Sequence, residues 1–137
     1  TVVEDSTGIY IGGMFSQVGP RTGHGIVWNI MGNARETQWP EVAGEEIRTV
    51  VSDGNGGWYI GGGFTYVAGQ PRKYIAHIFA NGTLDPVFNP DVDDWINTLV
   101  LDVNGNLYIG GYFMNVGGQS RNYIAKINAI TNIVIFI

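Results

Sequence analysis

Side chains able to react or to bind ions are few in this chain, and some of them recur at a fixed spacing. Arg72 and Arg121 lie 49 residues apart, and so do Glu45 and Asp94. A guanidinium and a carboxylate form strong bidentate hydrogen bonds. Because both types recur in step, we expect a structural tie between loops, with capture of an anionic ligand by the arginines as the alternative.

Metal and nucleophile chemistry has little support in the residue types present. The chain has two histidines, His24 and His77, and no cysteine, so a zinc site would need both histidines and carboxylates as well. The run Asp91-Val-Asp-Asp94 carries oxygens that suit Ca²⁺, but it lacks ligands at EF-hand spacing. No Ser-His-Asp motif is present. We therefore expect no catalytic residue, no metal site and no cofactor, with Ca²⁺ the one ion left open.

The composition excludes two further classes of function. The 137 residues carry a formal net charge of −5 with only seven Lys and Arg, which argues against binding a phosphate backbone. No apolar run reaches the roughly 18 residues that a membrane span requires. Hydrophobic residues make up 45% of the chain, enough to build a core, and the 21 glycines are about twice the usual share.

The elements that must position these side chains come from an internal repeat. The segments Gly8–Phe15, Gly57–Phe64 and Asn106–Phe113 each contain Tyr-Ile-Gly-Gly, and their tyrosines are spaced 49 residues apart. Residues 51–80 and 100–129 align without a gap and share 18 identities in 30 positions. A fixed period of this length indicates a repeat architecture.

Within each 49-residue unit the hydrophobic pattern alternates with a period of two, which is typical of strands. The turn Asp53–Gly57 and its counterpart Asp102–Asn106 use Gly and Asn, which adopt positive φ. We expect four short antiparallel strands in each unit. In the second unit the second to fourth strands should lie at 58–64, 74–79 and 84–88; the fourth strand of the first unit should lie at 36–41 and the first of the third unit at 95–101. Long loops are expected at 65–73 and 114–122. The double glycines inside the strands predict tight packing between units.

The repeat resembles a known family. Asp-x-x-Gly-x-Tyr-Ile-Gly-Gly-x-Phe, followed by Gly-Gln-x-Arg-x-Tyr-Ile-Ala and Asn-Gly-Thr-Leu-Asp-x-x-Phe-x-Pro, is similar to the delta-60 type repeat. The similarity is strongest over 50–90, and the third copy departs from it after Ala129. The resemblance implies an all-β β-propeller in a bacterial secreted or cell-surface protein, and it brings no catalytic residues.

On this interpretation the chain is one propeller segment of three four-stranded blades, 1–42, 43–91 and 92–137. Propellers use four to eight blades, so three leave blade faces uncovered. We expect either further blades from the same polypeptide, favoured by the abrupt start within a strand, or a second copy that completes a ring of six. The apolar tail Asn132–Ile137 should likewise be covered.

Binding residues concentrate on long loops held by a rigid scaffold, so we expect the site on the face that carries the long loops and the 42–45 and 89–94 connections. Tyr66 and Trp95 would stack on sugar rings or anchor a protein, although Trp95 also suits the core. The candidate binding residues are Arg72, Arg121, Tyr66, Trp95, Asn115, Glu46 and Asp94.

Two functions fit these residues. The first is a non-catalytic module of a secreted or cell-surface protein that binds protein or glycan, or serves as a spacer. The second is a carbohydrate-active hydrolase or lyase with Glu46 and Asp94 as acid and base, which would need two carboxyls about 5–10 Å apart beside a cleft. The module needs only the repeat and loop variation, and we favour it.

Overall fold

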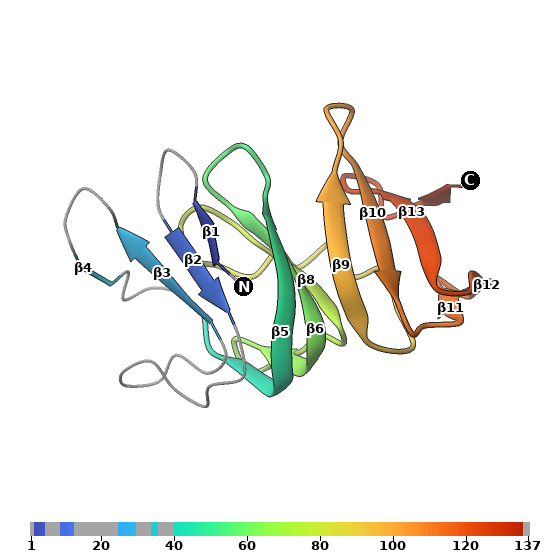
Figure 1. Cartoon of the computed structure of the whole chain (residues 1–137), viewed down its shortest axis with the longest axis horizontal. Coiled ribbons are helices and arrows are strands. Elements are labelled where there is room, and N and C mark those ends of the chain that lie inside the picture. Colours follow the sequence, from blue (N-terminus) through green and yellow to red (C-terminus); the bar gives the residue numbers. More distant parts are fainter. Residues whose placement is uncertain (1, 5–8, 13–24, 30–33, 36–39, 136–137) are drawn as a thin grey trace.

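The chain is all-β. The computed structural model describes residues 2–4, 9–12, 25–29, 34–35 and 40–135, and every regular element among them is a strand. None of these residues belongs to a helix that could cross a membrane. The strands form three main antiparallel sheets that lie in a row, the first at the left of Figure 1 and the third at the right.

The first sheet has the order β1-β2-β3-β4. Its strands are β1 (Val2–Glu4), β2 (Ile9–Gly12), β3 (Gly25–Asn29) and β4 (Ala34–Arg35). The fourth strand was expected at 36–41, where residues 36–39 lie outside the described part of the chain.

The second sheet contains the two longest strands. It consists of β5 (Val42–Ser52), β6 (Trp58–Val67), β7 (Gln70–Pro71) and β8 (Ile75–Ile78). β6 pairs with β5 on one side and with β7 and β8 on the other. The expected strand 84–88 reduces to a single bridge between Ile78 and Leu84. The Asp85 carboxylate accepts the next free N–H groups, those of Val87 and Phe88, and Pro86 has none to offer a ladder.

The third sheet repeats the second and adds a separate ribbon. Its order is β14-β13-β10-β9, and β11 pairs with β12 beside it. The strands are β9 (Ile96–Leu101), β10 (Asn106–Gly111), β11 (Asn115–Val116), β12 (Gln119–Ser120), β13 (Ile124–Asn128) and β14 (Val134–Ile135). The last strand pairs with β13 even though its sequence departs from the repeat.

The repeat is visible in the cross-strand register. Tyr59 pairs with His77 in the second sheet, and Tyr108 pairs with Lys126 in the third. Tyr74 and Tyr123, also 49 residues apart, both adopt positive φ, at 68° and 70°. Such angles are rare for tyrosine. Their recurrence shows that the two sheets share backbone detail as well as strand order.

The alternation of side chains between the two faces of each strand produces two clusters of buried hydrophobic residues. One buried cluster has Trp58, Ile60, Ala76 and Ile78 on one face of the second sheet, all at most 1% exposed. The other cluster lies between the second and third sheets and combines residues from both, Tyr59 and Ile75 from the second among them. The second sheet is therefore apolar on both faces.

The glycines of β6 pack closely in two different ways. A Cβ at Gly61 would lie 2.7 Å from Ile96 Cγ2 in β9. One at Gly63 would lie 2.7 Å from Glu45 Cβ in its own sheet and 2.8 Å from the ring of Trp95, the residue before β9. The predicted tight packing between units is confirmed at these two positions. A Cβ at Gly62 would instead collide with the carbonyl oxygen of Glu46, at a register shift within its own sheet.

Candidate functional site

The segments expected to share one face do lie together, but the long loops are hairpins. β6 continues to Val67 and turns into β7 through Ala68 and Gly69, which have φ of 53° and 71°. The β11–β12 ribbon turns in the same way through Gly117 and Gly118. Two residues at positive φ are typical of the tight hairpin turn that matches strand twist. The prediction of long loops at 65–73 and 114–122 was therefore wrong.

Each hairpin is tied to the segment that enters its sheet. Val42 pairs with Val67, and Val92 bridges to Val116. In Figure 1 the β11–β12 ribbon lies on the opposite side of its sheet from the β9–β10 turn. The hairpins and the entering segments thus form one face, which we name the hairpin face.

Tyr66 and Asn115 are exposed on the hairpin face, as is Asp94 in the segment before β9. Tyr66, 48% exposed, lies between Ala43 and Pro71. Asn115 donates its backbone N–H and its side-chain amide to Asp93, at 3.0 Å and 2.8 Å. These bonds from Asn115, with that from the N–H of Met114, hold the pKa of Asp93 below its ordinary value. Asn115 therefore fixes the hairpin to the loop before β9.

The two predicted arginines form hydrogen bonds to residues near them in the structure. Arg72 is 8% exposed and donates to the carbonyl oxygens of Pro71, Asp85 and Pro86, at 2.9 to 3.3 Å. No described ion pair joins it to a carboxylate, so the expected tie is wrong for Arg72. Arg121 donates to the carbonyl of Ser120 and to the side chain of Gln119.

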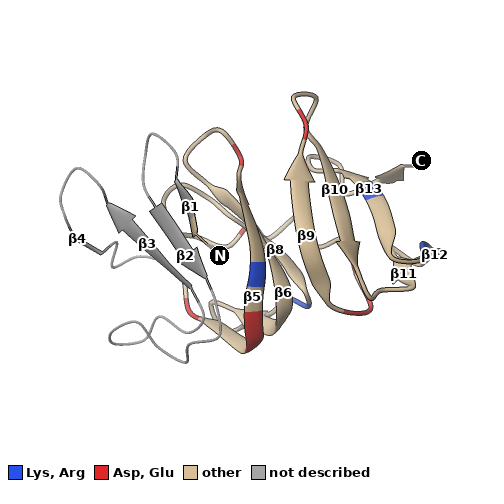
Figure 2. Ribbon diagram, in the orientation of Figure 1, with Lys and Arg blue, Asp and Glu red and all other residues tan. Residues whose placement is uncertain are grey.

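Glu46 and Trp95 meet through a residue that the sequence did not single out, Arg48. Its Nε lies 2.7 Å from Glu46 Oε1, its Nη1 lies 2.6 Å from Asn97 Oδ1, and its guanidinium carbon lies 4.2 Å from the centre of the Trp95 ring. Figure 2 shows the acidic and basic segments next to each other near the start of β5. We name Glu46, Arg48, Trp95 and Asn97 the seam cluster, because it joins β5 to β9.

The two carboxylates predicted as the alternative acid and base both have partners in the structure. The Glu46 carboxylate is held by Arg48, and Asp94 accepts the N–H of its neighbour Trp95 at 2.7 Å. Trp95 is half-buried, with its ring against Gly63 and beneath Arg48. The cluster can join two sheets. It also offers the exposed part of the Trp95 ring beside the hydrogen-bonded guanidinium of Arg48.

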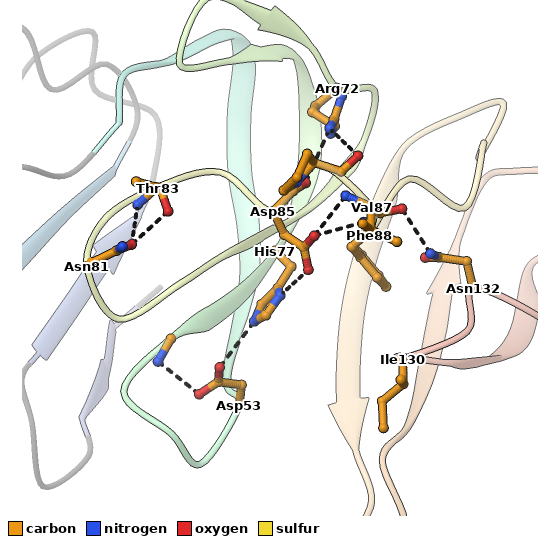
Figure 3. Close-up of polar contacts among 12 residues, drawn as sticks. Asp53, Arg72, His77, Asn81, Thr83, Asp85, Val87, Phe88, Ile130 and Asn132 are labelled. Atoms are coloured by element: carbon orange, nitrogen blue, oxygen red, sulfur yellow. Dashed lines mark hydrogen bonds and ion pairs between the residues drawn. The ribbon is translucent and has the colours of Figure 1, made fainter.

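A second polar cluster lies on the side of the second sheet away from the hairpin face. His77, 7% exposed, has Nδ1 at 2.9 Å from Asp85 Oδ2 and Nε2 at 3.1 Å from Asp53 Oδ2 (Figure 3). The ring stacks on Tyr59 with centroids 4.2 Å apart. Both carboxylates are themselves anchored, since Asp53 accepts from Asn55 and Gly57, and Asp85 from the two residues that follow Pro86.

This environment shifts the pKa of two of its members. Partial burial alone would raise the pKa of Asp85, but hydrogen bonds from His77, Val87 and Phe88 outweigh it, so the pKa lies below 3.8. Burial, with the charges of Asp53 and Asp85 adding to it, raises the pKa of Tyr59 to about 12. The carboxylate is thus held ionised and the phenol neutral.

An open cleft of about 350 Å³ lies beside His77, between the second and third sheets. Exposed apolar side chains surround its mouth, among them Val87 at 69% and Ile130 at 80%. Asn132 crosses from the third sheet and donates to the carbonyl of Val87 at 2.9 Å (Figure 3). The residues that line the cleft are Tyr59, His77, Phe79, Asp85, Val87, Phe88, Ala129 and Ile130.

Sequence reasoning missed this cluster, although a signal was present. His77 and Asp85 both break the repeat, being replaced by Lys126 and Val134 in the third unit. Asp53 recurs as Asp102 and was interpreted as a turn residue, a role it also has. His24 lies outside the described residues. Among those described, no three His or acidic side chains are grouped to hold a metal ion.

The comparisons agree with the strand repeat. A family described as a domain of unknown function (DUF5122), beta-propeller, matches residues 54–88 and 104–129. Those stretches fall in the second and third sheets at corresponding places. No curated protein and no solved structure matches the chain. The match supports a β-propeller repeat family, and the all-β structure with its antiparallel sheets is consistent with it.

Proposed function

We propose that this chain is a β-propeller segment of three blades, 1–42, 43–91 and 92–137, of the delta-60 type. The observation that carries the proposal is the placement of the first strand of each sheet. β5 contacts β1 and β2 of the preceding sheet, and β9 contacts β5 and β6. Sheets that meet through their first strands and fan outward are sectors around an axis.

The function that fits such a segment is a non-catalytic module of a secreted or cell-surface protein, binding protein or glycan or acting as a spacer. The hairpin face supports binding, since it offers the exposed Tyr66 ring on a rigid strand. An aromatic ring on a rigid element is suited to sugar rings and to protein partners. The half-buried Trp95 of the seam cluster offers a second ring.

A glycan array and a protein pull-down with Tyr66→Ala and Trp95→Ala test this proposal. We expect ligand retained by the parent chain to be lost on Tyr66→Ala without any turnover. Val103→Ala is the matched control, because Val103 is fully exposed in the β9–β10 turn, on the other face. Carbohydrate cleavage abolished by Glu46→Gln would overturn the module in favour of a hydrolase.

A further inference from the structure

Three Asn-Gly steps lie in turns of the described chain, with exposed asparagines at Asn55, Asn81 and Asn104. The glycine of each step adopts positive φ, between 75° and 87°. An asparagine before glycine is open to self-modification, because no Cβ hinders attack of the glycine nitrogen on the asparagine side chain. The three steps share this local sequence, so differences between them come from the fold.

The modification is deamidation through a cyclic imide. The backbone nitrogen of the glycine forms a bond to Cγ of the asparagine, while the Cγ–Nδ2 bond breaks and the amide nitrogen leaves as ammonia with the glycine proton. Water then opens the ring at one of its two carbonyl carbons, which gives either an aspartate or an isoaspartate. In the isoaspartate the main chain passes through Cγ and is one methylene longer.

The Asn81 step is held at both reacting groups. Gly82 donates its N–H to the carbonyl oxygen of Phe79 at 2.9 Å. The side-chain oxygen Oδ1 of Asn81 accepts the backbone N–H and the hydroxyl of Thr83, at 3.0 Å and 2.7 Å (Figure 3). Ring closure at this step therefore first has to break hydrogen bonds of the attacking nitrogen and of the side chain it must reach.

The turns that contain Asn55 and Asn104 are counterparts, but they are closed differently. Gly105 donates its N–H to the Asp102 carbonyl oxygen at 3.1 Å. Among the described residues, none accepts the N–H of Gly56, the counterpart of Gly105. Of the three steps, the one at Asn55 thus has the attacking nitrogen free of a described hydrogen bond.

The side chain of Asn55 is also weakly held. Its one hydrogen bond among the described residues runs from Nδ2 to the Asp53 carbonyl oxygen at 3.4 Å, longer than the usual range. From these contacts we propose that Asn55 is a site of spontaneous deamidation in the folded chain, ahead of Asn81 and Asn104. The reaction consumes only water besides the chain, and it is independent of any ligand that the hairpin face binds.

The product acts on the polar cluster around His77. Asn55 and Gly57 donate their N–H groups to Asp53 Oδ1, at 2.7 Å and 2.8 Å. Oδ2 of the same carboxylate lies 3.1 Å from His77 Nε2. An added methylene after residue 55 displaces Gly57, which has little room, since a Cβ on it would lie 2.6 Å from the Ile78 carbonyl oxygen. Isoaspartate at this position therefore loosens the Asp53 carboxylate.

Peptide mapping by mass spectrometry tests the proposal on the full chain, incubated at mildly alkaline pH and sampled over time. Each deamidation adds about 1 Da to its peptide. We expect Asn55 to react at least about fivefold faster than Asn81 and Asn104, the ratio that one net hydrogen bond supplies. In the urea-unfolded chain the three rates should converge, because all three residues precede glycine. A folded chain in which Asn55 is not the fastest of the three, or does not react, would overturn the proposal.

The stability of the aged chain tests the effect on the His77 cluster. Chains with isoaspartate at position 55 should melt at a lower temperature than the parent chain. Asn55→Asp is the matched control, because it adds the charge without the methylene and should melt closer to the parent. Asn55→Gln should abolish the mass gain over the same period, because its longer side chain would have to close a larger ring. A mass gain that persists in Asn55→Gln would overturn the assignment, and an aged chain as stable as Asn55→Asp would overturn the link to His77.

Discussion

At the scale of single residues, His77 is a buried side chain with a carboxylate at each ring nitrogen. Its two ring nitrogens contact the Oδ2 atoms of Asp85 and Asp53, while the Oδ1 atom of each carboxylate accepts backbone N–H groups. At the same register position in the third sheet, Lys126 lies over Tyr108 with its Nζ 5.2 Å from the ring centre. A nitrogen-bearing side chain beside a tyrosine is thus a feature of both sheets, and two carboxylates in contact with it are a feature of the second sheet.

Removing the ring nitrogens of His77 should therefore lower the free energy of unfolding. His77→Phe keeps an aromatic ring over Tyr59 but removes the contacts of Asp53 and Asp85 with the ring nitrogens. We expect a loss of about 2–4 kcal/mol in the free energy of unfolding, measured by urea denaturation. Lys126→Ala is the control at the equivalent position and should cost less than about 1 kcal/mol. Equal losses in the two variants would contradict the described hydrogen bonds of His77.

The lowered pKa of Asp85 gives a pH dependence with a definite sign. Its pKa lies below 3.8 in the folded chain, so its ionised form stabilises the fold above that pH. The contribution is lost as the pH falls through the folded pKa. Asp85→Asn should lower the free energy of unfolding at neutral pH and flatten its decline below about pH 4. If the free energy of unfolding of Asp85→Asn declined at acid pH as steeply as that of the parent chain, this assignment would be wrong.

At the scale of elements, neighbouring glycines in β6 meet different obstacles. A side chain at Gly61 meets Ile96, whose methyl groups can shift, whereas one at Gly62 meets the backbone of Glu46. We expect Gly61→Ala to cost about 1–3 kcal/mol and Gly62→Ala to cost more than about 3 kcal/mol, measured by thermal and urea unfolding. The opposite order would show that the register shift beside Gly62 is not as described.

The β6–β7 turn offers a change that should stabilise the protein. Ala68 adopts φ of 53°, a region that is costly for alanine, while its counterpart in the ribbon is Gly117. Asparagine tolerates this region and is preferred before glycine in this type of turn. Ala68→Asn should raise the free energy of unfolding by about 0.5–1 kcal/mol. Ala68→Val, with a branched side chain, should lower it.

At the scale of the whole molecule, the seam cluster reports how the sheets are placed. Arg48 and Asn97 are 49 residues apart and hydrogen-bonded at 2.6 Å, so equivalent positions of successive sheets touch directly. A double-mutant cycle with Arg48→Ala and Asn97→Ala should give a coupling of about 0.5–1.5 kcal/mol. Arg48→Ala combined with Asn104→Ala, in the exposed β9–β10 turn, should be additive. Zero coupling in the first cycle would contradict the side-by-side placement of β5 and β9.

Strand positions were largely predictable, because alternation and turn residues act locally. The strands at 58–64, 74–79 and 95–101 were placed to within a few residues. The hairpins at 65–73 and 114–122 were mistaken for loops, since one turn contains Ala68 at positive φ and the other follows a very short strand. The strand at 84–88 failed because Asp85 takes the backbone donors that a ladder would need.

The amino-acid order alone was enough to establish the repeat length, the strand character of each unit and the turns, since each depends on residues close together in the chain. Which polar groups meet was decided only by the tertiary structure. Asp53, His77 and Asp85 come together because a cross-strand register and a chain reversal place them on one face. Arg48 reaches Trp95 because two sheets stand against each other, and such contacts depend on distances that local sequence does not specify.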